Sequence, residues 1–144
     1  MPITDPSQEY FKDGTWGWNG SAWVKLGIVW NYAGTYRETV SAGNATAGTN
    51  YLNGAVVPAG EVWVVQHVQA VDVTSGIASI EARLVNGGYL SSLLADYSPV
   101  ADHFSVASGG WLMAAGEKLQ FRYAGCVLND NLEGQALGYK MKVA

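Results

Sequence analysis

The sequence predicts an all-β protein, an antiparallel β-sandwich with a Trp-rich segment at its N-terminus. Apolar and polar residues alternate with a period of two in several separated segments, which is the pattern of half-buried strands. Turn-forming clusters of Gly, Asn, Ser and Pro separate these segments at intervals of about ten residues. Residues 90–94 are the one segment that suggests a turn of helix, and it is short. Short strands joined by such turns are typical of sandwiches and barrels.

The first expected element is a two-stranded ribbon near the N-terminus. The dipeptide Asn19-Gly20 tolerates the positive φ angles of a tight hairpin turn, and Trp residues flank it on both sides. An isolated hairpin is marginal in water, so its rings must pack on the rest of the chain, on a neighbouring subunit or on a partner. We therefore expect residues 1–26 to form an arm that includes this ribbon, and residues 27–144 to form the sandwich. The partner-contact candidates in the arm are Tyr10, Phe11, Trp16, Trp18 and Trp23.

The Trp residues of the ribbon allow two interpretations. Trp16 and Trp18 share a face by the two-residue period, and Trp23 is a cross-strand partner on the other side of the turn. Stacked rings of this kind bind the faces of sugars or dock on another protein. Alternatively, the rings cover an edge of the chain's own sandwich. The sequence leaves both interpretations open.

The strands of the sandwich follow from residue periodicity. Residues 62–65, VWVV, do not alternate and are rich in β-branched side chains, which favours a strand covered on both faces. Residues 78–84, 118–123 and 137–143 alternate cleanly between apolar and polar. Each apolar set should lie on one face of its strand. The side chains expected to point into the core are Ile80, Leu84, Leu119, Phe121, Tyr123, Leu137, Tyr139 and Met141.

Two short segments echo each other and predict the arrangement of the sandwich. Residues 56–63 read VVPAGEVW and residues 112–119 read LMAAGEKL, so each has two apolar residues, an Ala-Gly-Glu turn and a new strand. Glycine supplies the backbone freedom that such a turn needs. Two equivalent corners fit a jelly roll made of two Greek-key halves.

The charge of the chain is low and evenly spread. Eight Lys and Arg against twelve Asp and Glu give a net charge of -4, and charged residues make up 14% of the sequence. A nucleic-acid footprint needs clustered cations, so we expect no nucleic-acid partner. A weakly charged surface rich in small residues suits a protein that neighbours cover in an assembly. The N-terminus lacks the pattern of a secretory signal, and the apolar residues 62–73 are too few and too interrupted to span a membrane.

Histidine and cysteine are too few for the common metal sites. Cys126 is the single cysteine, which excludes an intrachain disulfide and a cysteine-based zinc site. His67 lies in the most apolar strand and is expected to be a core or interface histidine with satisfied hydrogen bonds. Asp102 beside His103 suggests part of a catalytic triad, but neighbours on a strand point to opposite faces, so we expect no such pair.

Carboxylates offer the remaining catalytic and metal-binding candidates. A glycosidase needs two of them close in space, and a calcium ion needs several oxygen ligands. A calcium site would fall within residues 129–133, although their spacing lacks the EF-hand pattern. We interpret all the candidates as solvent-facing charges, and we expect no enzyme activity, no metal and no cofactor. These carboxylates are Asp72, Glu81, Asp130 and Glu133.

Residues 18–26, WNGSAWVKL, resemble a short element near the ends of tailed-bacteriophage fibre and virion-associated proteins: an aromatic residue, Asn/Asp-Gly, Ser/Thr, any residue, Trp, any residue, Lys/Arg and Leu. Residues 58–63, and residues 115–119 leading to 138–139, are similar to small jelly-roll-like modules of such proteins. The resemblance implies a non-enzymatic virion structural protein without a cofactor. It implies a homotrimeric subunit, made in the host cytoplasm, that decorates the major capsid protein or belongs to the tail or fibre.

A second class of function stays open beside this one. The chain could be a carbohydrate- or receptor-binding β-sandwich module that uses Trp16, Trp18 and Trp23 as a stacking platform for a glycan.

Overall fold

A computed structural model describes residues 16–18, 21, 23–25 and 30–143. Within them the chain is all-β, and residues 90–94 belong to a strand rather than to a turn of helix. The described residues therefore include no helix that could span a membrane. The ten strands are β1 (Trp16–Trp18), β2 (Trp23–Lys25), β3 (Trp30–Ala42), β4 (Gly48–Val56), β5 (Glu61–Asp72), β6 (Ser79–Val85), β7 (Tyr89–Tyr97), β8 (Ser105–Met113), β9 (Lys118–Cys126) and β10 (Leu132–Val143).

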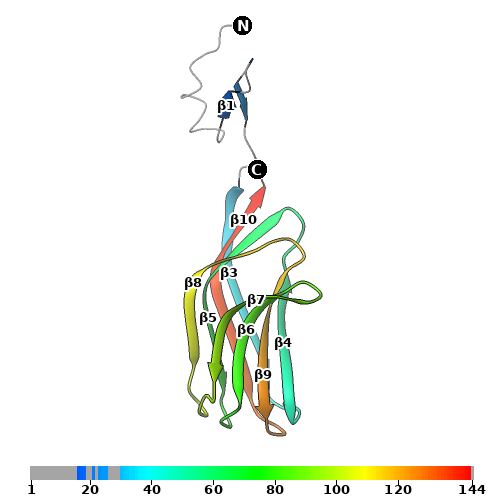
Figure 1. The fold of residues 1–144 in the computed structure, drawn as a ribbon, viewed down its shortest axis with the longest axis vertical. Coiled ribbons are helices and arrows are strands. Elements are labelled where there is room, and N and C mark those ends of the chain that lie inside the picture. The colour runs from blue at the N-terminus through cyan, green and yellow to red at the C-terminus, as the bar shows by residue number, and fades with distance from the viewer. Residues whose placement is uncertain (1–15, 19–20, 22, 26–29, 144) are drawn as a thin grey trace.

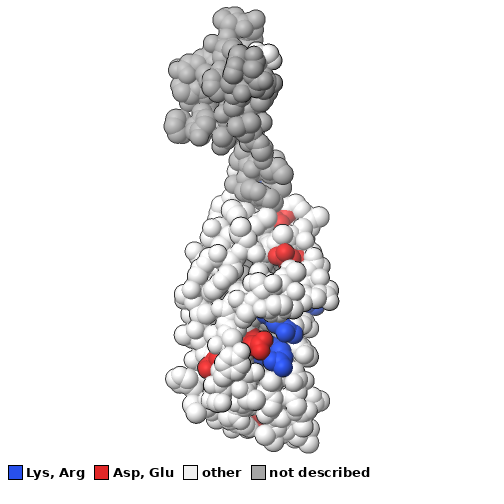
Figure 2. Space-filling view, in the orientation of Figure 1, with Lys and Arg blue, Asp and Glu red and all other residues white. Residues whose placement is uncertain are grey.

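Eight of these strands form two four-stranded antiparallel sheets, with the orders β3-β10-β5-β8 and β4-β9-β6-β7. The two sheets pack face to face and enclose one apolar core (Figure 1). The predicted antiparallel sandwich is therefore confirmed. Figure 2 shows one side of the molecule, on which charged residues are sparse, as the composition indicates.

The strands pair as one long folded ribbon. β3 pairs with β10, β4 with β9, β5 with β8 and β6 with β7, so the first half of the sandwich runs back along the second half. One arm of the ribbon crosses from one sheet to the other between β4 and β5, and the other arm crosses back beside it between β8 and β9. The two crossings are the segments that echo each other in the sequence.

The two crossings are hydrogen-bonded to each other. The Val57 N–H donates to the Glu117 carbonyl at 2.8 Å, and the Gly116 N–H donates to the Val57 carbonyl at 2.9 Å. Gly60 and Gly116 both have positive φ, 80° and 87°, which explains the glycine at this position in each segment. The sequence echo therefore marks one corner of the sandwich, where the two arms turn together.

The core agrees with most of the predicted inward-facing residues. Ile80, Leu119, Phe121 and Tyr123 are fully buried, and Leu84 is buried as well. In β5, residues 63–65 are all buried, as expected for a strand covered on both faces. Alternation in β6 and β9 thus identified both the strand and the face that it turns to the core.

For β10 the predicted face is wrong. Leu137 is 45% exposed, and Tyr139 and Met141 are partly exposed, because the alternate residues Leu132, Gly134, Ala136 and Gly138 are the buried ones. Small residues are required there. A Cβ on Gly134 would lie 2.7 Å from the Phe121 ring, and one on Gly138 would overlap the Val64 carbonyl oxygen. Leu137, Tyr139 and Met141 therefore lie on the outer face of the sheet.

The two ends of the sandwich differ. The chain enters β3 and leaves β10 at the same end, where Trp30 pairs with Val143 (Figure 1). The opposite end consists of the loops 43–47, 73–78, 98–104 and 127–131, which we call the loop end.

The predicted N-terminal ribbon corresponds to the pair β1 and β2. The two strands are antiparallel, with Trp18 opposite Trp23 and Trp16 opposite Lys25. The predicted tip, Asn19-Gly20, lies outside the described residues. That residues 1–26 act as a separate arm stays a prediction.

Candidate functional site

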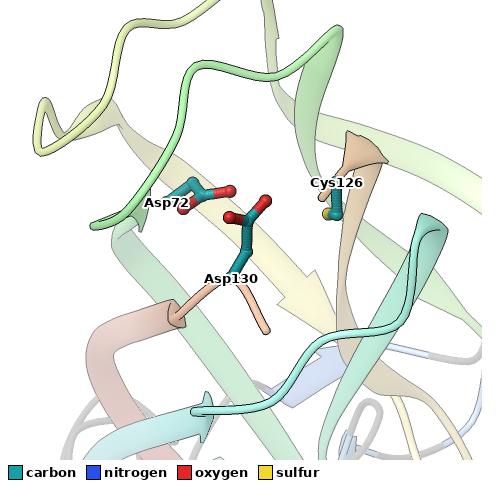
Figure 3. A group of neighbouring side chains, drawn as sticks. All are labelled: Asp72, Cys126 and Asp130. Atoms are coloured by element: carbon teal, nitrogen blue, oxygen red, sulfur yellow. The ribbon is translucent and has the colours of Figure 1, made fainter. Parts of the chain in front are cut away.

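Two carboxyl groups and a thiol meet in the interior of the loop end. Asp72 ends β5, Cys126 ends β9, and Asp130 lies in the loop before β10; the ligand-type atoms of all three lie within 4.8 Å of one another (Figure 3). Asp72 is 2% exposed and Asp130 is 1% exposed. The expectation that both carboxylates face solvent is wrong, because the folded ribbon brings strand ends that are distant in sequence together under the loops.

The two carboxyl groups close the loops around them. Asp72 Oδ1 accepts the backbone N–H groups of Thr74 at 2.9 Å and Ser75 at 3.0 Å, so it fixes the turn that follows β5. Asp130 Oδ2 accepts the Val127 N–H at 2.6 Å, and its Oδ1 accepts the Ser75 hydroxyl. Ser75 therefore links the loop 73–78 to the loop 127–131.

The pKa values of the two carboxyl groups shift in opposite directions. Asp72 Oδ2 is buried without a hydrogen-bond partner among the described residues, and the two carboxyl groups point toward each other (Figure 3). Burial, and next the neighbouring Asp130, raise the pKa of Asp72. Burial opposes ionisation of Asp130 as well, but hydrogen bonds from Ser75, Val127 and Asp72 lower its pKa. The pKa of Asp72 therefore lies above that of Asp130, so Asp72 holds its proton over a range of pH in which Asp130 is ionised.

The three groups of this cluster are better suited to hold a proton between the carboxyl groups than to bind a metal cation. Burial raises the pKa of the Cys126 thiol, which keeps it in the neutral form that binds metals poorly. Of the two carboxylates of the segment 129–133, Asp130 belongs to this cluster and Glu133 does not; the Glu133 carbonyl accepts the Tyr123 hydroxyl at 2.5 Å. Glu81 instead forms an ion pair with Arg122, with Nη1 and Oε1 2.8 Å apart.

The loop end exposes several apolar side chains and few charges. Val100, Phe104, Val127 and Leu128 are 64%, 42%, 57% and 64% exposed. The four loops contain no Lys, Arg or Glu, and Asp102 is their one exposed carboxylate. Exposed apolar residues that gather in one place mark interaction sites in soluble proteins. No sequence pattern predicts this surface, since its residues come from separate loops.

Neither histidine belongs to a catalytic or metal-binding group among the described residues. His67 is half-buried in β5, with Nδ1 3.0 Å from the Ser108 hydroxyl and Nε2 3.4 Å from Gln69 Oε1, so the predicted satisfied histidine is confirmed. Asp102 and His103 lie in the loop 98–104 rather than on a strand, and Asp102 has φ of 56°. The strand argument used against that pair therefore does not apply there.

The predicted partner-contact residues lie at the other end of the chain. Trp16, Trp18 and Trp23 are brought into one hairpin by the pairing of β1 with β2. Tyr10 and Phe11 lie outside the described residues. Contact of these five residues with a partner stays a prediction.

No family model matches this sequence, and no curated protein matches it. Two solved structures of infectious bursal disease virus resemble the chain. The chain from the Gx strain is 9% identical with a TM-score of 0.41, and the alignment covers 89% of this chain and 35% of that one. The chain from the Gt strain is 9% identical with a TM-score of 0.30, covering 88% and 36%. This chain thus spans about a third of the length of the viral chains, and likeness at this level defines no shared function.

Proposed function

We propose that this chain is a non-enzymatic structural protein of a phage virion, a decoration or stabilising subunit on the capsid or tail surface. The apolar loop end carries the proposal. Val100 and Leu128 are both 64% exposed in loops without Lys, Arg or Glu. Such a surface is costly to leave in water and suits a site that a neighbouring protein covers.

The strand arrangement supports a jelly roll of the kind that builds viral capsid domains. The orders β3-β10-β5-β8 and β4-β9-β6-β7, with paired crossings at one corner, support a ribbon wound into two Greek keys. The phage origin rests on the resemblance of residues 18–26 to elements of fibre and virion-associated proteins.

The proposed subunit has two contact regions. The Trp-rich hairpin precedes β3, which starts at the end of the sandwich opposite the loop end. A subunit with an aromatic anchor before one end and an apolar surface at the other can join two neighbours at once. We propose that the chain forms a homotrimer and contacts the major capsid protein.

The buried carboxyl pair supports a structural rather than a catalytic role. The carboxyl groups of Asp72 and Asp130 accept hydrogen bonds from the backbone N–H groups of Thr74, Ser75 and Val127, which lie in loops of the same chain. Their function in the proposed subunit is to hold the loops that present the apolar surface.

Sedimentation velocity of the full chain tests the proposal. We expect a concentration-dependent trimer that Val100→Glu weakens, because a charge at the loop end must be desolvated on docking. Val56→Glu is the matched control, since Val56 is 54% exposed at the opposite end of β4. Immunogold electron microscopy of native particles should place the chain on their surface. A strict monomer that is absent from particles would overturn the proposal.

A further inference from the structure

The outer face of the β4-β9-β6-β7 sheet contains a hollow of about 300 Å³. Its walls include the rings of Tyr51 in β4 and Tyr89 in β7, which are 49% and 61% exposed. Arg83 of β6 lies between them, and Gln120 and Lys118 of β9 complete the polar part of the lining. The turn Gly87-Gly88 forms one rim. The hollow thus combines two exposed aromatic faces with cationic and amide groups.

The guanidinium of Arg83 is held in a defined orientation. Its Cζ lies 5.3 Å from the Tyr51 ring centroid and 5.9 Å from that of Tyr89. Its Nε donates to Gln120 Oε1 at 2.9 Å, and Gln120 Nε2 donates to Asn53 Oδ1 at 2.9 Å. These contacts use Nε and leave the two terminal nitrogens of the guanidinium to a ligand.

Arg83 differs from its neighbour Arg122 in its charge balance. Arg122 is neutralised by Glu81 at 2.8 Å, whereas Arg83 has no carboxylate within 4.0 Å among the described residues. Lys118 adds a second positive charge to the hollow, and no Asp or Glu lines it. The hollow is therefore a local positive site on a chain whose net charge is -4.

We propose that this hollow binds an acidic sugar, a pyranose ring that carries a carboxylate. The planar fork of Arg83 matches a carboxylate in two parallel hydrogen bonds, and Lys118 adds charge. The C–H face of the pyranose packs on an exposed Tyr ring, and the second N–H of the Gln120 amide, which Asn53 does not use, can donate to a ring hydroxyl. A volume of about 300 Å³ is at the lower end for ligand pockets, which suits a single sugar ring.

The charge of the chain favours a sugar over a nucleic acid. Nucleic-acid binding requires clustered cations, and this chain has eight Lys and Arg against twelve Asp and Glu. The site is also separate from the loop end, because Tyr51, Arg83 and Gln120 lie within strands and Gly87-Gly88 lies at the opposite end of β6. Its test is therefore independent of the test of virion assembly.

Titration of the full ¹⁵N-labelled chain by NMR tests the proposal, with glucuronate as the ligand and glucose as its neutral counterpart. We expect saturable shifts of the Gly87 and Gly88 amide signals with glucuronate, and binding of glucose that is about tenfold weaker because it lacks the charge-assisted hydrogen bonds. Arg83→Gln should weaken glucuronate binding by about tenfold on the same grounds. Tyr89→Ala should also weaken it.

The control variant is Tyr97→Ala, which removes a ring that is 74% exposed in β7 but does not line the hollow. It should bind glucuronate like the unmodified chain, and the spectrum of each variant reports whether the fold is intact. Equal binding of glucose, tighter binding of adenosine monophosphate or inorganic phosphate, or shifts that do not saturate would each overturn the proposal. Unchanged binding by a folded Arg83→Gln variant would overturn it as well.

Discussion

The carboxyl groups of Asp72 and Asp130 face each other beneath the loop end, although 58 positions separate them in the sequence (Figure 3). Each also closes a loop of its own, through Thr74 and Ser75 on one side and Val127 on the other. Val127 and its neighbour Leu128 belong to the exposed apolar surface. The protonation of this pair therefore affects the conformation of the loops that form the surface that we propose for docking.

The stability of the chain should have a maximum at mildly acidic pH. The raised pKa of Asp72 means that its contribution to stability is lost as the pH rises through that folded-state value. The lowered pKa of Asp130 means that its contribution is present above the ordinary value of about 3.9 and is lost as the pH falls through its folded-state value. Urea unfolding between about pH 3 and pH 8 measures the effect. A free energy of unfolding that is constant from pH 4 upward would contradict it.

Asp72→Asn should separate the roles of the two carboxyl groups. The amide of Asn keeps an acceptor for the N–H groups of Thr74 and Ser75 and donates permanently to Asp130, as the neutral acid does. We expect the variant to be at least as stable as the unmodified chain at pH 7 and to lose the decline at higher pH. Asp130→Asn, the matched control, removes the charged acceptor of Ser75 and Val127 and should cost about 1–3 kcal/mol. Equal destabilisation by the two substitutions would rule out the shared proton.

Gly134→Ala should destabilise the sandwich, although Ala costs less backbone entropy than Gly. Its Cβ would lie 2.7 Å from the Phe121 ring, which is fully buried and has no room to move away. Overpacking of this kind costs about 1–3 kcal/mol. Gly110→Ala in β8 is the control, because a Cβ there has no atom within 4 Å. Thermal unfolding compares the two, and an equal effect at both positions would show that the contact with Phe121 does not limit the size of residue 134.

The same contact explains which part of the fold the sequence predicts. Periodicity identified β6, β9 and β10 as strands, and the repeated Ala-Gly-Glu segments marked the corner where both arms of the ribbon turn. Periodicity does not tell which of the two alternating sets of side chains in a strand faces the core when one set is mostly large and the other mostly Gly and Ala. For β10, the bulk of Phe121 on the facing sheet decides it, and that is a tertiary fact. Small residues can be predicted to face the core only when the side chain that opposes them on the other sheet is known.

The candidate sites were harder to predict than the strands. The sequence places Asp72 and Asp130 beside turns, which predicts solvent-facing charges, and only the pairing of β5 with β10 brings them together. Tyr51, Arg83 and Tyr89 come from three strands and share no sequence motif. Such sites depend on strand order, which a single sequence leaves open, whereas the Trp-rich hairpin is a local pattern and could be predicted directly.

Chelation should leave the folded chain unchanged. Burial keeps the Cys126 thiol neutral and favours the protonated form of Asp72, and we infer that this proton serves in place of a metal ion. We expect the same melting temperature with and without EDTA, measured by circular dichroism in a metal-free buffer and after addition of calcium or zinc. A drop of many degrees on chelation would instead identify a cation held by this cluster, and Asp72→Asn should then abolish the drop.

Deletion of residues 1–23 should leave a folded sandwich that has lost its assembly. The sandwich begins at β3, whose first residue, Trp30, pairs with Val143, so the deletion removes no strand of either sheet. The hairpin carries more aromatic area than two short strands can bury within themselves, and aromatic residues dominate interface hot spots. Replacing Trp18 and Trp23 by Ala should weaken assembly by roughly 2–4 kcal/mol for each ring that is buried as a hot spot.

The deletion also decides between the two interpretations of the Trp cluster. Circular dichroism reports the fold of the shortened chain, and sedimentation velocity reports its assembly. Tyr32→Ala is the control for loss of an exposed ring, since Tyr32 is 71% exposed in β3, and it should assemble like the unmodified chain. If the shortened chain aggregates or fails to fold, the Trp rings cover the chain's own sandwich, because a segment that only contacts partners is not needed for folding.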